Sequence, residues 1–178
     1  MSAPQKTNPL ATLKLIGAGS SFQQELCAML EGNNLFNDLQ WAEIQALARH
    51  MQAYEAEKGK VLFHEGEPGH YLCIIVKGKV DIHKEDSAHA NKIIASVGPG
   101  KTLGEMSVID GEPRSATATA AMPTTFAILS QEHLTQLMKE SPALAAKVLL
   151  KMARLLSQRL RQSSGLLVDY LGQENNAR

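Results

Sequence analysis

The sequence predicts an α+β domain in which an antiparallel, jelly-roll-like β-roll is flanked by N-terminal helices and a long C-terminal helix. Three observations predict it. Apolar residues recur at helical spacing between residues 38 and 52. From residue 59 onward, short segments rich in Val and Ile alternate with glycine-containing turns, as in antiparallel rolls. The stretch 141–170 then has one proline, near its start, and one glycine, as expected of one long helix.

The composition is that of an ordinary globular domain: 178 residues, 44% hydrophobic and 20% charged. Because 18 basic residues balance 18 acidic ones, no global charge draws the chain to nucleic acid or to an anionic membrane. No run approaches the ~18 apolar residues that span a bilayer, and the N-terminus lacks a continuous signal-peptide core. We therefore expect a cytoplasmic protein in which Cys27 and Cys73 are buried free thiols.

The N-terminal third is expected to be helical after a poorly ordered lead-in over residues 1–19. A short helix is predicted over 20–30, with Gly32 as its break. A second helix is predicted over 38–52, with one apolar face made by Ile44, Leu47, Ala48 and Met51. We assign residues 1–34 to a flexible segment with a short helix, 35–172 to the domain and 173–178 to a tail.

The centre of the chain is expected to hold the strands of the roll. They are predicted over 61–63, 71–76, 79–83, 92–97, 116–120 and 124–129. Ser130 is the expected N-cap of a short helix reaching Lys139. Ser141 and Pro142 provide an N-cap and a proline at the first position of the terminal helix, expected to run to about Tyr170.

Residues 104–120 read GEMSVIDGEPRSATATA. This segment resembles the phosphate-binding cassette of the cyclic-nucleotide-binding domain family, which includes the catabolite activator protein and regulatory subunits of cyclic-AMP-dependent protein kinase. The family pattern is Phe-Gly-Glu, a few apolar residues, then Pro-Arg, small residues and a strand. The resemblance extends over residues 35–172, through FHEGEPGHYLCIIVKGKVDI and GPGKTLGE, with Leu103 standing where phenylalanine is common.

The resemblance implies how the cassette would hold a cyclic phosphate, which carries one negative charge. Arg114 would supply a forked, permanently charged donor. A short helix from Met106 to Ile109 would direct free backbone N–H groups, including that of Ser107, at the same phosphate. Ser115 would add a hydroxyl donor.

The resemblance also implies contacts to the sugar and the base. Glu105 would accept the proton of the ribose 2′-hydroxyl, as carboxylates do in dinucleotide sites. Gly104 would permit close approach of the backbone to the sugar. Val97 and Leu103 would line the base pocket.

The terminal helix carries an apolar seam with a single polar interruption, which is typical of a coiled-coil dimer interface. The seam consists of Leu149, Met152, Leu156, Leu160, Ser163, Leu167 and Leu171. The run Arg159 to Ser164 resembles the helix of the catabolite activator protein that reaches the adenine. By that resemblance Ser163 would contact the adenine amino group in its own subunit and Ser164 would do so across the dimer. The alternative, serines on a fraying helix, stays open, and Gly165 departs from the family pattern by weakening the helix and marking a candidate kink.

These features predict a cyclic-nucleotide sensor, with cyclic AMP as ligand, that is not an enzyme. It would form a homodimer and signal to an unknown effector protein through its C-terminal helix. Two alternatives stay open: cyclic GMP or cyclic di-GMP as the ligand, or a constitutive dimeric adaptor without a ligand. A cupin-type metal enzyme is disfavoured because the sequence has no His-x-His.

We expect neither DNA nor membrane as a partner. After the terminal helix too few residues follow for a helix-turn-helix module. Basic residues crowd the terminal helix, which favours a solvated flank over a nucleic-acid surface; they are Lys147, Lys151, Arg154, Arg159 and Arg161.

Overall fold

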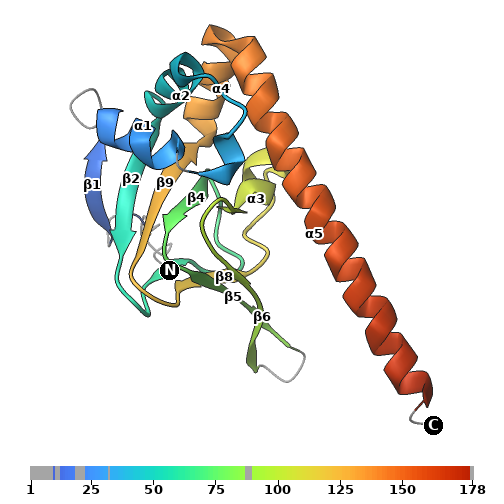
Figure 1. The fold of residues 1–178 in the computed structure, drawn as a ribbon. Coiled ribbons are helices and arrows are strands. Elements are labelled where there is room, and N and C mark those ends of the chain that lie inside the picture. Colours follow the sequence, from blue (N-terminus) through green and yellow to red (C-terminus); the bar gives the residue numbers. More distant parts are fainter. Residues whose placement is uncertain (1–9, 11–12, 19–22, 32, 87–89, 177–178) are drawn as a thin grey trace, which may run out of the picture.

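The computed structural model describes residues 10, 13–18, 23–31, 33–86 and 90–176 (Figure 1). Its elements follow the predicted order of helices, β-roll and long terminal helix, except that a strand precedes the first helix. The strands over these residues are β1 (Lys14–Ala18), β2 (Met51–Ala56), β3 (Val61–Phe63), β4 (Tyr71–Lys77), β5 (Val80–Glu85), β6 (Asn91–Val97), β7 (Thr102–Leu103), β8 (Thr117–Ala120) and β9 (Thr124–Ser130). The helices are α1 (Gln23–Glu31), the 3-10 helix η2 (Asn34–Phe36), α2 (Trp41–Ala48), α3 (Glu105–Asp110), α4 (Gln131–Glu140) and α5 (Pro142–Asn176).

The strands form two antiparallel sheets that close the roll. One sheet has the order β1-β2-β9-β4-β7 and the other has the order β3-β8-β5-β6. Apolar side chains from both sheets fill the space between them, including Leu62 of β3, Ile75 of β4 and Phe126 of β9. Helices α1, α2 and α4 gather at one end of the five-stranded sheet (Figure 1).

Strand β4 shows how the five-stranded sheet separates two cores. Cys73 and Ile75 point into the roll, whereas Leu72 and Ile74 pack with the helices. Because successive side chains of a strand point to opposite faces, β4 can be buried on both. The predicted continuous apolar run over 71–76 therefore marks a strand covered on both faces.

Helix α5 has an anchored half and an exposed half. Near its start, Val148 and Met152 pack in the helical core, and Lys147 pairs with Glu43 at 2.6 Å. Residues 160–168 are all exposed, and α5 runs past α3 and out beyond the roll (Figure 1). This exposed half carries four large apolar side chains: Leu160, Leu166, Leu167 and Val168.

The N-terminal third differs from prediction in two places. Residues 14–18, expected to be poorly ordered, form β1, which pairs with β2. The second helix was predicted too long: it ends at Ala48, and Met51–Ala56 is strand β2. Hydrogen bonding to β1 on one side and β9 on the other outweighs the weak strand propensity of this segment.

The C-terminal elements agree closely with prediction. The hydroxyl of Ser130 accepts a hydrogen bond from the His133 amide, which confirms the predicted N-cap of α4. Helix α5 begins at Pro142 as predicted but extends beyond Tyr170 to Asn176. It is a single helix through Gly165. The predicted free thiols are confirmed, since Cys27 and Cys73 are both buried and unpaired.

Candidate functional site

The cassette lies between β7 and β8, where the chain turns sharply into a short helix. Gly104 adopts a left-handed backbone (φ 72°) and caps α3, which spans Glu105–Asp110 and confirms the predicted short helix. Glu105, Ser107 and Arg114 are buried, whereas the side chains of Met106 and Ser115 are exposed. The segment thus places one carboxylate and one guanidinium in the protein interior.

Arg114 is a buried cation with neutral hydrogen-bond partners. Only 2% of the residue is exposed. Its Nη1 donates to the carbonyl oxygen of Gly104 at 2.8 Å, and its Nη2 donates to that of Tyr71 at 2.7 Å. Among the described residues, no carboxylate forms an ion pair with it. A buried charge without a counter-ion is costly, so the site favours an incoming anion.

Two neighbouring ionisable groups, the Cys73 thiol and the Tyr71 phenol, do not supply that anion. Burial raises the pKa of the Cys73 thiol to about 12, and burial also raises the pKa of the Tyr71 phenol. Both groups therefore remain neutral near pH 7. Neither side chain can therefore neutralise the charge of Arg114.

Glu105 connects the cassette to α5. The residue is 1% exposed, and its Oε1 pairs with Nη1 of Arg159. Nη2 of Arg159 donates to the carbonyl oxygen of Thr102. This one side chain of α5 therefore binds Thr102 and Glu105, which lie on either side of Gly104 in the sequence. The second oxygen of Glu105, Oε2, has no hydrogen-bond partner in the part of the chain that the structure describes.

Three buried polar side-chain atoms lack a partner among the described residues, and all belong to this segment. They are Oγ1 of Thr102, Oε2 of Glu105 and Nε of Arg114. Buried polar atoms are nearly always hydrogen-bonded, and each unsatisfied one costs about 1–3 kcal/mol. Their concentration between residues 102 and 114, in the segment that also carries a guanidinium without a carboxylate partner, is typical of a binding site for a polar ligand.

Residues 54–141 match the family model of the cyclic nucleotide-binding domain. The crystal structure of a cyclic nucleotide-binding domain from Methylobacillus flagellatus is 36% identical, with a TM-score of 0.79 over 92% of each chain. The chain belongs to the cyclic nucleotide-binding domain family. This family binds cyclic nucleotides for regulation rather than catalysis.

Two curated members of the family are bacterial regulators. The cyclic AMP receptor protein of Thermus thermophilus is 31% identical over 82% of this chain and 65% of its own length. A CRP-like cAMP-activated global transcriptional regulator of Mycobacterium tuberculosis is 28% identical over 77% of this chain and 59% of its own length. The chain therefore spans about three fifths of the length of these relatives.

The structure brings together most of the residues predicted for a cyclic-nucleotide site, but not all. Residues 104–107, 114 and 115 lie in the cassette, and Arg159 is joined to it by its ion pair. Leu103 lies in the core inside the roll, and Val97 packs against that core. Ser163 and Ser164 are exposed on α5, and the Ser164 hydroxyl donates to the carbonyl oxygen of Leu160.

Sequence reasoning missed the residues that surround the Arg114 guanidinium from other strands. The Phe63 and Tyr71 ring centroids lie 4.3 and 4.6 Å from its Cζ. Gly69 approaches so closely that a Cβ there would lie 2.8 Å from Cζ. Aromatic residues on both sides of the turn GEPG were the available signal, in a chain that is only 4% aromatic.

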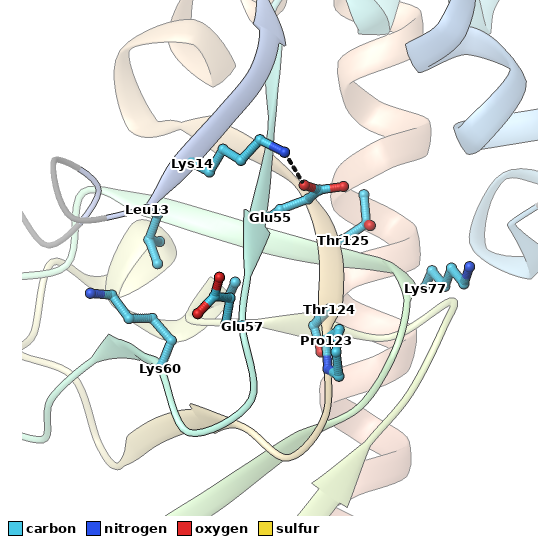
Figure 2. Close-up of a pocket in the computed structure, with 10 residues that line it drawn as sticks. Leu13, Lys14, Glu55, Glu57, Lys60, Lys77, Pro123, Thr124 and Thr125 are labelled. Carbon is cyan, nitrogen blue, oxygen red and sulfur yellow. Dashed lines mark hydrogen bonds and ion pairs between the residues drawn. The ribbon is translucent and has the colours of Figure 1, made fainter.

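A second hollow lies at the other end of the roll. It has a volume of about 530 Å³ and is lined by the end of β4, the turn after β2 and the start of β9. Lys14 and Glu55 pair across its wall at 2.9 Å, and Glu57, Lys60 and Lys77 surround it (Figure 2). Tyr71 and Lys77 are the two ends of β4, so this hollow is roughly 20 Å from the cassette.

The described residues lack two further features. No helix among them is long and apolar enough to cross a membrane. No three His, Cys, Asp or Glu side chains among them gather where they could hold a metal ion.

Proposed function

We propose that this chain is a cyclic-nucleotide sensor that prefers cyclic AMP and signals to a partner protein through α5. The observation that carries the proposal is the buried guanidinium of Arg114, which among the described residues has no counter-ion and an unpartnered Nε. The phosphate of a cyclic nucleotide would supply the missing negative charge. The exposed hydroxyl of Ser115 would add a donor from the same loop.

The unpartnered oxygen of Glu105 supports a contact to the sugar. Oε2 would accept the ribose 2′-hydroxyl while Oε1 stays paired with Arg159. Ligand binding would then bear directly on α5, because one carboxylate would join the sugar to this helix. A ligand shifts the equilibrium between two positions of α5 only as far as it binds more tightly to one of them.

The exposed half of α5 supports a homodimer. Its four exposed apolar side chains need a cover, and a second α5 would provide one. Ser163 and Ser164 would then face the base from the two subunits. Recognition of adenine by these serines, with Val97 and Leu103 as the wall, is the basis for preferring cyclic AMP over cyclic GMP.

Calorimetric titration with cyclic AMP, cyclic GMP and cyclic di-GMP tests the proposal, after unfolding and refolding to remove any ligand carried through purification. We expect micromolar or tighter binding of cyclic AMP and weaker binding of the other two. Hydrogen exchange of α5 with and without cyclic AMP tests the signalling step, with slower exchange over residues 160–168 expected. Absence of binding by all three nucleotides would overturn the sensor function and favour the constitutive adaptor.

A further inference from the structure

We propose that Phe63 and Tyr71 form an aromatic clamp that holds the Arg114 guanidinium in place, and leaves its charge available, before any ligand arrives. This inference rests on the proposed function, because the ligand is taken to be a cyclic nucleotide phosphate. It adds two positioning residues that lie outside the cassette.

The clamp is built from both sheets of the roll. Phe63 ends β3 in the four-stranded sheet, and Tyr71 begins β4 in the five-stranded sheet. The Tyr71 hydroxyl donates to the carbonyl oxygen of Leu62 at 3.0 Å, which ties the two strands together. Both aromatic residues are buried, at 5% and 8% exposure, so the guanidinium meets their rings away from water.

Further contacts hold Arg114 from the backbone. The carbonyl oxygen of Tyr71 accepts from Nη2, so the same residue supplies a ring and an acceptor. The Arg114 amide donates to the carbonyl oxygen of Glu67, and the Gly66 amide donates to that of Arg114. The side chain is therefore fixed at its head by the rings and at its base by the 64–67 turn.

The chemical nature of the clamp matters for binding. An aromatic ring attracts a cation through its quadrupole but carries no net charge. A carboxylate in the same place would cancel the charge of Arg114, and an incoming phosphate would have to displace it. Two rings and two carbonyls stabilise the guanidinium while its Nε stays unpartnered. Binding then does not require a carboxylate to be displaced from Arg114, which favours affinity.

Replacing the ring of Phe63 by an aliphatic side chain tests the clamp. We expect Phe63→Leu to weaken cyclic AMP binding by about 3- to 30-fold, whereas Phe63→Tyr, which keeps a ring, binds like the wild type. Melting temperatures of the unliganded variants report whether each is folded. Phe63→Met serves as the second ring-free variant if the leucine variant does not fold.

A spectroscopic measurement separates positioning from general packing. The Nε–H resonance of Arg114 in the unliganded protein is assigned by its absence from Arg114→Lys. We expect it to be sharp and ring-shifted in the wild type and in Phe63→Tyr. In the ring-free variant we expect it to be broadened or moved.

The outcomes distinguish the clamp from the function on which it rests. Weaker binding together with an altered Nε–H resonance in the ring-free variant supports the clamp. Unchanged binding or an unchanged resonance overturns the clamp and leaves the sensor function intact. If the wild type binds none of the nucleotides, the sensor function fails, and the ligand role of the clamp fails with it.

Discussion

The two ends of the β-roll hold charged side chains in opposite ways. At the cassette end, Arg114 is buried without a counter-ion, and three buried polar atoms lack partners. At the other end, the Lys14 and Glu55 side chains are 76% and 45% exposed and pair with each other. Lys60 and Lys77 stand around the same open hollow (Figure 2).

This difference shows which feature identifies a ligand site in this fold. The hollow at the far end has an ample volume, but its charged side chains either pair with each other, as Lys14 and Glu55 do, or are accessible to solvent. At the cassette, the protein alone leaves charge and hydrogen bonding incomplete. We therefore base the proposed nucleotide site on these unsatisfied charges and polar atoms rather than on empty volume.

The largest effect is expected from removing the uncompensated charge. Arg114→Met keeps the length of the side chain and should weaken cyclic AMP binding by about 30-fold to several thousand-fold in calorimetric titration. The free energy of unfolding of the unliganded protein should change by less than about 2 kcal/mol, because relief of a buried charge offsets two lost hydrogen bonds. Binding equal to that of the wild type would show that the cassette is not the site.

The next effect concerns the sugar contact at the same end. Glu105→Gln removes the acceptor charge and the ion pair with Arg159, and should weaken cyclic AMP binding by about 10- to 100-fold. The control ligand is 2′-deoxy cyclic AMP, which the wild type should bind more weakly by a similar factor. The variant should distinguish the two nucleotides less than the wild type does, because its amide oxygen is a weaker acceptor than a carboxylate; undiminished discrimination would show that Glu105 does not accept a hydrogen bond from the 2′-hydroxyl.

A smaller effect is expected where the backbone packs on the guanidinium. In Gly69→Ala, the new Cβ would lie 2.5 Å from the Ser107 Cβ and 2.8 Å from Cζ of Arg114, so one of them must move. We expect binding to weaken by about 5- to 100-fold. Gly98→Ala is the matched control, since the nearest atom to its Cβ is the Gly78 oxygen at 3.9 Å. Equal affinities of the two variants would contradict the predicted close packing.

A strand could be predicted from the sequence where its own residues favour an extended backbone. Strands of the roll with runs of Val and Ile, such as Tyr71–Lys77, carry their own signal. Strand β2, MQAYEA, has no β-branched residue and is extended because strands flank it on both sides. Strand β7 has two residues, too few for any periodicity to show.

The site residues also differ in whether neighbours in the sequence or the folding of distant segments bring them together. The cassette residues could be predicted because Gly104, Glu105 and Arg114 lie within eleven consecutive positions. Tyr71 lies 43 positions from Arg114, and its contact depends on how the two sheets close. The motif around Arg159 predicted a site residue, but its ion pair with Glu105 spans 54 positions and needed the packing of α5. Recognition of the base by Ser163 and Ser164 stays a prediction.

The smallest effect is expected at the far end of the roll. The double substitution Lys60→Ala and Lys77→Ala removes two basic side chains that form no ion pair among the described residues. Because these side chains are solvated and roughly 20 Å from the cassette, cyclic AMP affinity should change by less than about twofold. A loss comparable to that of Arg114→Met would place the nucleotide in the larger hollow instead. Exposed, solvated charges would then identify the site, and the buried charge of Arg114 would not.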